Sequence, residues 1–287
     1  MEAQQNLTIC VCGAGTMGSG IAQVAAVAGH PTILYDVDPG VLDRARATIA
    51  ANLQQLENRG KLPAGSQDRV MSEIRFSGQI SDCRAGLCIE AIIEQVSAKQ
   101  ELFAQLAAVN GDHSIYATNT SSLSVTGLAA GFRFPERLVG LHFFNPAPLM
   151  KLVEIVMTPL TAGSLRAELV SIVEQLGKRA VVCRDSPGFI VNRVARPFYI
   201  EALRLAETGA IPFSMIDELM EATGFRMGPF KLMDLIGNDI NYTVSVQVYE
   251  QLGKPGRLRP SPIQQSLVAA GKLGRKTGQG YYRYPAQ

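Results

Sequence analysis

Short apolar or β-branched runs alternate with longer runs of helical period from Leu7 to about Cys183. Strands buried on both faces read as continuous apolar runs, and covering helices show one apolar side, so this alternation predicts strand–helix–strand units around a mainly parallel sheet. Apolar positions recur at helical spacing within Val41–Asn58 and Lys99–Val109, which predicts helices that cover the sheet. The expected strands are Leu7–Cys12, Thr32–Asp36, Leu87–Ile92, Ser114–Thr118, Leu138–Phe144, Lys151–Val156 and Ala180–Cys183.

The pattern changes after Asp185, where helical period continues with little strand signal. The runs that carry it are Val191–Glu207, Phe213–Ala222 and Leu232–Leu252. We therefore expect an α/β domain over residues 1–185, followed by a smaller all-helical domain over residues 186–287. The runs Phe198–Leu205 and Tyr242–Tyr249 offer more apolar surface than so small a unit readily buries, which predicts that the helical domain forms a symmetric homodimer.

The composition fits a globular protein and narrows its partners. Hydrophobic residues make up 47% of the 287 residues and charged residues 18%, and 27 Lys plus Arg nearly balance 25 Asp plus Glu, which argues against a nucleic-acid-binding surface. No apolar run approaches the roughly 20 residues that a membrane-spanning helix needs. The polar start Met1–Cys10 is not typical of a secretion signal.

The five cysteines include no Cys-x-x-Cys pair, and the three histidines show no ligand spacing, so we expect no metal site. An odd number of cysteines, all in or beside apolar stretches, is typical of buried thiols in a reducing compartment. We therefore expect a cytoplasmic protein.

The most informative short motif is Gly13-Ala14-Gly15-Thr16-Met17-Gly18, which follows the first expected strand and opens a helix. Gly13 permits a tight turn, Gly15 lets the backbone approach a pyrophosphate, and Gly18 allows the helix to pack closely on the strand. Thr16 and Met17 lie in the first helical turn, whose N–H groups face the anion. Glycines alone also occur in ordinary strand-to-helix turns, so the surrounding elements decide the interpretation.

Those elements support a dinucleotide site. The second expected strand ends at Asp36, where a carboxylate accepts a hydrogen bond from a ribose 2′-OH and repels a 2′-phosphate. Strand, loop, helix, second strand and terminal acid together indicate a Rossmann-type domain that binds NAD in preference to NADP. Asp38, close by, is more typical of a helix cap before Pro39.

A histidine and a glutamate are expected to meet across two strands. An antiparallel return about Asn145-Pro146-Ala147-Pro148 would set His142 opposite Glu154. An imidazole beside a carboxylate can act as a general acid and base for an alcohol proton, because it titrates near neutral pH and the carboxylate fixes its tautomer. The alternative is a hydrogen-bonded core histidine, although Glu154 in an apolar run also needs a partner.

Several blocks in order resemble the 3-hydroxyacyl-CoA dehydrogenase family. They are Gly13–Gly18, Asn119-Thr120-Ser121-Ser122, His142-Phe143-Phe144-Asn145-Pro146, Lys151–Glu154, Asp185–Arg193, Met227–Phe230, Asp234–Gly237 and the tail Gly274–Tyr282. The resemblance spans nearly the whole chain. Two further blocks, Asn238–Asn241 and Pro262–Gln265, are similar to bacterial enzymes that oxidise 3-hydroxybutyryl-CoA or 3-hydroxyadipyl-CoA.

The resemblance implies a role for each matching residue. His142 would be the catalytic base and Glu154 its partner. Ser121 and Asn192 would hydrogen-bond the acyl-CoA substrate near its 3-oxygen and thioester. The resemblance also implies further contacts: Asp36 with the adenine ribose, Glu94, Lys99 and Asn119 with NAD, Asn145 with the substrate and Lys61 with the CoA phosphates.

Alternatives stay open for several of these residues. Ser121 and Ser122 precede a helical run and could cap it, and Lys61 could simply be solvated. A substrate with a terminal carboxylate would need a cation, for which Arg193, Arg196 and Arg226 are candidates, unless they pair with helix acids such as Glu201. At the level of the whole chain, the alternatives are a dehydrogenase of free hydroxy or sugar acids and a non-catalytic NAD-binding protein.

Overall fold

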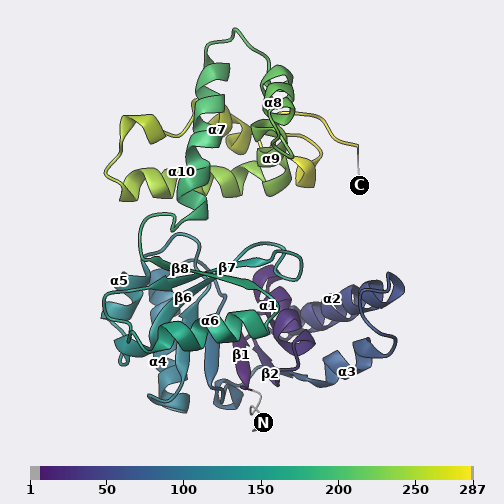
Figure 1. Cartoon of the computed structure of the whole chain (residues 1–287), viewed down its shortest axis with the longest axis vertical. Helices are drawn as coiled ribbons and strands as arrows, with labels where there is room; N and C mark the ends of the chain where they lie inside the picture. The colour runs from purple at the N-terminus through teal and green to yellow at the C-terminus, as the bar shows by residue number, and fades with distance from the viewer. Residues whose placement is uncertain (1–6, 286–287) are drawn as a thin grey trace. The chain divides into compact units, whose positions relative to one another are not determined.

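The structure is a computed structural model that describes residues 7–285. The expectation that the chain starts without a secretion signal falls mostly on residues 1–6, outside that range. The chain divides into a first unit that ends at Asp185 and a second that begins at Ser186 (Figure 1). Over the described residues, no helix combines the length and apolar character needed to cross a membrane.

The first unit is built on one eight-stranded sheet with the order β3-β2-β1-β4-β5-β6-β7-β8. The strands are β1 (Ile9–Cys12), β2 (Thr32–Tyr35), β3 (Ile74–Ser77), β4 (Leu87–Glu90), β5 (Ile115–Thr118), β6 (Leu138–Phe143), β7 (Leu152–Met157) and β8 (Arg179–Arg184). Strands β1 to β6 pair in parallel, whereas β7 runs antiparallel to β6 and β8 parallel to β7. The order of the first six strands is that of a Rossmann fold, as predicted.

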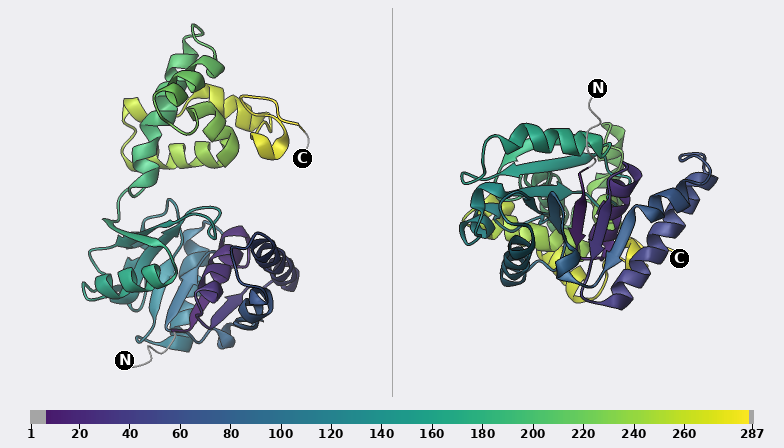
Figure 2. Two further views of the ribbon diagram at one scale, coloured as in Figure 1. Left: turned by 45° about the vertical axis from the view of Figure 1, so that its right-hand side comes forward. Right: turned by 90° about the horizontal axis from the view of Figure 1, so that it is seen from below.

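Helices cover both faces of this sheet (Figures 1 and 2). They are α1 (Thr16–Val27), α2 (Pro39–Asn58), α3 (Ser66–Ser72), α4 (Val96–Asn110), α5 (Val125–Ala130) and α6 (Leu165–Gln175). Successive strand residues point to opposite faces. Ile9 and Val11 therefore join the main core with α1, α2 and α6 on one side, while Tyr116 packs against Phe103 of α4 on the other.

All the expected strands are present, with ends that differ by at most two residues. The strand β3 was not expected from the sequence. It is a four-residue edge strand, and its Arg75 is exposed, so it leaves almost no apolar pattern. Short edge strands are commonly blunted in this way.

The second unit is helical. Its helices are α7 (Val191–Glu207), α8 (Phe213–Ala222), α9 (Pro229–Ile236), α10 (Asn238–Gln251) and α11 (Pro262–Ala269). The run Leu232–Leu252 is helical, but it forms two helices, because it is interrupted at Gly237, which has a φ of 104°. That left-handed region favours glycine and ends α9 before α10 begins.

The exposed apolar surface lies only partly in the expected runs. Within Phe198–Leu205 and Tyr242–Tyr249, the side chains of Ile200, Leu203 and Val248 are buried. Leu205 at the end of the first run is 43% exposed, and further large exposed hydrophobic side chains occur on α8, α9 and the start of α10: Met215, Leu219, Leu235, Ile236 and Ile240.

A buried carboxylate fastens the end of the chain to the helical unit. Asp234 of α9 is 1% exposed and accepts hydrogen bonds from the backbone N–H groups of Tyr281 and Tyr282 and from the Tyr284 hydroxyl. A Cβ atom at Gly280 would lie 1.9 Å from an Asp234 oxygen, so only glycine fits there. Asp234 is thus a main anchor of the tail that resembles the family, and the Tyr282 hydroxyl also donates to Asp217.

Candidate active site

The glycine loop between β1 and α1 has the geometry that a dinucleotide requires. Gly13 has a φ of 101°, and a Cβ there would lie 2.5 Å from the Ala91 carbonyl oxygen. A Cβ at Gly18 would lie 1.7 Å from the Gly13 carbonyl oxygen, so α1 can approach the strand only with glycine at this position. Apart from Gly15 and its two neighbours in the chain, no described atom lies within 4 Å of a Cβ built at Gly15, which fits a backbone left open to a ligand.

Asp36 supports this loop directly. Its Oδ2 accepts a hydrogen bond from the Ala14 N–H at 2.8 Å, and its Oδ1 accepts one from the Asp38 N–H at 3.0 Å. The carboxylate therefore links the end of β2 to the turn that precedes α1. Asp38 caps α2 by accepting from the N–H groups of Gly40 and Val41, which confirms the cap interpretation.

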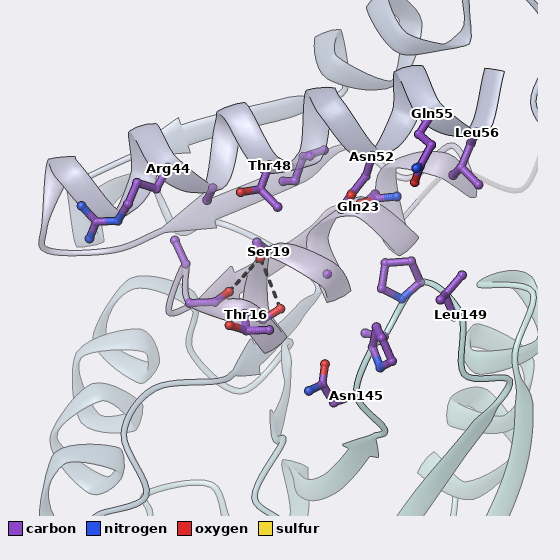
Figure 3. Close-up of a pocket in the computed structure, with 18 of the residues that line it drawn as sticks. Thr16, Ser19, Gln23, Arg44, Thr48, Asn52, Gln55, Leu56, Asn145 and Leu149 are labelled. Carbon is purple, nitrogen blue, oxygen red and sulfur yellow. Dashed lines mark hydrogen bonds between the residues drawn. The ribbon is translucent and has the colours of Figure 1, made fainter. Parts of the chain in front are cut away.

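A cavity of about 630 Å³ opens beside this loop (Figure 3). One wall is the start of α1, with Thr16 and Ser19, and a second wall is formed by Asn145 and the turn that follows β6. The third wall is one face of α2 together with the residues beyond its end: Arg44, Thr48, Asn52, Gln55, Leu56, Arg59 and Lys61. Lys61 and Asn145, both expected at a substrate site, thus line the same cavity.

The antiparallel pair of β6 and β7 brings His142 and Glu154 together. The strand register places the two residues directly opposite each other, as the sequence predicted. His142 Nδ1 lies 2.6 Å from Glu154 Oε2, and the two residues are 5% and 0% exposed. The Phe144 ring lies 4.5 Å from the imidazole, between ring centroids. Because an ionised carboxylate only accepts hydrogen bonds, it fixes the proton on Nδ1 and assigns proton exchange to Nε2.

Behind the site lies a buried ionic cluster that sequence reasoning found only in part. Lys99 is 1% exposed and contacts Glu90 Oε1 at 2.5 Å and Glu94 Oε2 at 3.1 Å. Glu90 itself is fully buried and also accepts from the Ile92 N–H and the Thr118 hydroxyl. The available signal was an acid within the apolar strand Leu87–Ile92, since a buried charge needs a partner.

Through Glu94, this cluster reaches the segment expected to hold substrate. Glu94 Oε1 accepts hydrogen bonds from the Thr120 hydroxyl, the Ser121 N–H and the Ser122 hydroxyl. Burial alone would raise the pKa of Glu94, but the charge of Lys99 and hydrogen bonds from Thr120, Lys99 and Ser122 together lower it. An ionised Glu94 therefore organises the loop that contains Ser121.

Ser121 and Ser122 do not cap the following helix, contrary to the alternative raised from the sequence. The cap of α5 is Ser124, whose hydroxyl accepts from the Gly127 N–H. Asn119, at the end of β5, accepts a hydrogen bond from the Phe143 N–H at 2.9 Å, so it ties the loop after β5 to the residue next to His142.

In the second unit, Asn192 is the second residue of α7, and Arg196 lies one turn further on. Arg196 is 3% exposed and donates to the carbonyl oxygens of Asn192 and Asn241 and to the Ser245 hydroxyl. Arg196 is therefore neither a surface ion pair nor a ligand for a substrate carboxylate. The acid Glu201 pairs with Arg204 instead. Of the arginine candidates, Arg193 and Arg226 are exposed.

Two family models cover the chain in succession. The model described as "3-hydroxyacyl-CoA dehydrogenase, NAD binding domain" matches residues 8–186, and "3-hydroxyacyl-CoA dehydrogenase, C-terminal domain" matches residues 188–284. The chain belongs to the 3-hydroxyacyl-CoA dehydrogenase family. Its first part is the NAD-binding domain of this family of oxidoreductases.

The names of similar proteins fit this family, but they give different substrates. The chain is 45% identical over 282 residues to "3-hydroxyadipyl-CoA dehydrogenase" of Escherichia coli, covering 98% of this chain and 59% of that protein's length. It is 40% identical over 284 residues to mitochondrial "Hydroxyacyl-coenzyme A dehydrogenase" of Sus scrofa, covering 96% and 90%. A crystal structure of "3-hydroxybutyryl-CoA dehydrogenase" from Escherichia coli superposes with a TM-score of 0.95 at 44% identity, covering 99% of this chain and 60% of that one.

Proposed function

We propose that this chain catalyses the NAD-dependent, reversible oxidation of a short-chain L-3-hydroxyacyl-CoA to the 3-ketoacyl-CoA. The observation that carries the proposal is the buried hydrogen bond of 2.6 Å between His142 Nδ1 and Glu154 Oε2. A histidine with only a structural role would not need an ionisable partner. Burying a carboxylate without a compensating partner in the sheet interior costs free energy, so this pairing favours a role in catalysis.

His142 is the general base for the substrate hydroxyl. Its Nε2 takes the 3-hydroxyl proton as the alcohol is oxidised, and Glu154 stabilises the imidazolium that results. In the reverse direction, the same imidazolium returns the proton to the 3-keto oxygen. Ser121, Asn192 and Asn145 hydrogen-bond the substrate near the 3-oxygen and the thioester and orient the reacting carbon.

The residues around the glycine loop fit NAD. Gly13, Gly15, Thr16, Met17 and Gly18 receive the pyrophosphate, because the loop is open at Gly15 and the start of α1 presents backbone N–H groups. Further cofactor contacts come from Asp36, Asn119 and Glu94, and Lys99 acts through Glu94, since its own side chain is buried. When bound, NAD accepts the hydride that leaves C3 of the substrate.

The cavity beside the loop fits the CoA part of the substrate. Arg44, Arg59 and Lys61 give its rim three positive charges that suit the CoA phosphates. The apolar side chains of Leu56 and Leu149 suit the thin chain that connects those phosphates to the thioester. Binding of CoA here would distinguish this chain from a dehydrogenase of free hydroxy or sugar acids.

The proposal includes a homodimer in the cytoplasm. The exposed apolar side chains of α8 and α9 supply a surface for a second copy of the helical unit. All five cysteines are free thiols, as is usual for proteins of a reducing compartment.

Formation of NADH by the purified chain tests the proposal. The substrates are 3-hydroxybutyryl-, 3-hydroxyhexanoyl-, 3-hydroxyadipyl- and 3-hydroxypalmitoyl-CoA, with free 3-hydroxybutyrate as the control without CoA. We expect the highest kcat/KM for chains of four to six carbons and no turnover of the free acid. Turnover of the free acid would favour a hydroxy-acid dehydrogenase. NAD binding without NADH formation from any thioester would favour a non-catalytic protein.

A further inference from the structure

A compact group of three thiols lies on one face of the sheet, at the strand that leads to the glycine loop. The sulfur atoms of Cys10, Cys12 and Cys83 all lie within 4.8 Å of one another, and all three residues are 0% exposed. Cys10 and Cys12 are two residues apart on β1 and so point to the same face of the sheet. Cys83 directly follows a short 3₁₀ helix, Ile80–Asp82, and reaches the same place from the loop before β4.

The spacing of Cys10 and Cys12 suits separate sulfur ligands better than a disulfide between them, and all three cysteines are free thiols. Cys10 Sγ and Cys12 Sγ are 3.8 Å apart. Residues two apart on an extended strand have Cα atoms roughly 6.6 Å apart, near the far end of the separation that a disulfide spans. Three sulfurs around one point, with no nitrogen or oxygen ligand in the group, form the donor set of a soft, three-coordinate centre.

The net charge of three thiolates together with the atom they bind indicates which metal or metalloid suits this buried position. Three thiolates carry three negative charges, so a monovalent or divalent ion would leave a net negative charge in the core. The residues opposite Cys10 and Cys12 on the adjacent strands are Ile33, Tyr35, Cys88 and Glu90. Glu90 is an acid already paired with Lys99, and Arg75, the cation that acts on Cys83, is paired with Asp82, so none of these groups brings an unpaired cation to offset the charge. Burying an uncompensated charge is costly, whereas a trivalent centre gives a neutral complex.

We propose that Cys10, Cys12 and Cys83 form a binding site for a trivalent thiophilic metalloid, of which arsenite is the simplest example. In the reaction with As(OH)₃, three As–S bonds replace three As–O bonds. Each thiol proton leaves with a hydroxide as water, so three waters are released and nothing is oxidised or reduced. None of the three cysteines is among the residues assigned to NAD or acyl-CoA, although Cys12 directly precedes Gly13, and the site does not rest on the proposed activity.

The loop that carries Cys83 offers a route of entry. Ser81 and Arg84, on either side of Cys83, are exposed, and the 3₁₀ helix between β3 and β4 is only three residues long. Local opening of such a segment costs far less free energy than global unfolding, so it can admit a small neutral solute such as As(OH)₃.

Native mass spectrometry of the reduced, full-length chain titrated with sodium arsenite tests the site. We expect one adduct that adds a single arsenic atom and removes three hydrogen atoms, and an arsenic X-ray absorption spectrum with three sulfur neighbours. The variants Cys10→Ser, Cys12→Ser and Cys83→Ser should each weaken binding roughly tenfold or more, because one As–S bond is lost.

Two matched controls separate the site from general thiol reactivity. Cys183→Ser, on β8, and Cys88→Ala, on the neighbouring strand, should bind arsenite like the unchanged chain. Circular dichroism and NAD binding show whether each variant is folded. No adduct at micromolar arsenite, or an adduct that persists unchanged in folded Cys83→Ser, would overturn the proposal.

Discussion

One hydrogen bond links the two residues on which the proposed chemistry depends. Glu154 lies fully buried on β7, and the strand register alone sets it opposite His142 on β6. Because the register of an antiparallel pair is fixed by its turn and by the burial of both strands, the two side chains are oriented before any substrate binds. That preorganisation leaves little reorganisation for the reaction step.

Replacing His142 with Asn should remove most of the turnover and leave NAD binding nearly unchanged. The variant loses the general base, which is typically worth about 100- to 10,000-fold, while the glycine loop is untouched. Steady-state kinetics gives kcat, and isothermal titration calorimetry gives the NAD Kd. Near-normal kcat in this variant would contradict the assignment of the base.

Glu154→Gln keeps the shape of the side chain but removes its charge. We expect a large fall in kcat with a smaller change in substrate KM, because the imidazolium that forms during the reaction loses its counter-charge. The pH dependence of kcat should change as well, which a purely structural role would not produce. A rise in KM with unchanged kcat would make Glu154 a substrate-binding residue instead.

Different substitutions separate the observed hydrogen bond of Asp36 from its proposed role in selecting the cofactor. Asp36→Asn retains an oxygen that can accept from the Ala14 N–H, whereas Asp36→Ala removes that bond too. The asparagine variant should lower the ratio of kcat/KM for NAD over NADP by roughly tenfold, since the 2′-phosphate is no longer repelled. The alanine variant should bind both cofactors more weakly. An unchanged ratio in both variants would show that Asp36 does not select the cofactor.

Contacts between residues that are close in the sequence could be predicted, whereas contacts between distant residues could not. The opposition of His142 and Glu154 followed from strand period and a turn, which are local properties. The burial of Arg196 against Asn241 and Ser245 follows from the packing of α7 on α10, which no local pattern encodes. The thiol group likewise joins Cys10 and Cys12 to Cys83, about seventy positions along the chain.

At the scale of elements, buried strands and amphipathic helices could be predicted from the sequence, but the point at which a helical run is interrupted could not. The helices α7 and α8 have the expected bounds, because their apolar positions repeat without a break. The break at Gly237 was missed because apolar residues continue through it at compatible spacing. A single glycine at a positive φ overrides that periodicity.

The tail of the chain should loosen when Asp234 is replaced with Asn. One oxygen that accepts from the Tyr282 N–H and the Tyr284 hydroxyl would become an amide that cannot accept from either. We expect a loss of about 3 kcal/mol in the local opening free energy, from two hydrogen bonds to a charged acceptor. Hydrogen exchange at the Tyr281 and Tyr282 amides should then accelerate roughly a hundredfold.

The control is Asp239→Asn, which weakens a partly exposed ion pair with Lys276. Such pairs are worth at most about 1 kcal/mol, so exchange at the tail amides should change little. Equal acceleration in both variants would show that Asp234 has no special part in holding the tail.

At the scale of the whole molecule, the sequence changes near Ser186 from alternating strands and helices to helices alone. The structure divides the chain into two units at the same place. The association of the helical unit with a second copy was expected from its apolar content. Most apolar side chains of Phe198–Leu205 and Tyr242–Tyr249 are at least partly buried, although Leu205 is exposed, and further exposed apolar positions lie on α8 and α9. The sequence of a helix shows how many apolar residues it has but not which of them its neighbours bury.

The helical unit should therefore dimerise through α8 and α9, which pack against each other and both expose apolar side chains. Leu219 of α8 is 59% exposed, and Leu235 of α9 is 49% exposed. Leu219→Glu introduces a charge that is costly to bury in a dimer but costs little on an exposed helix, so it should shift sedimentation from dimer to monomer at micromolar concentration. Leu160→Glu, at an exposed position of the first unit, is the matched control and should stay dimeric. A monomeric unchanged chain, or a Leu219→Glu variant that remains fully dimeric, would contradict this surface.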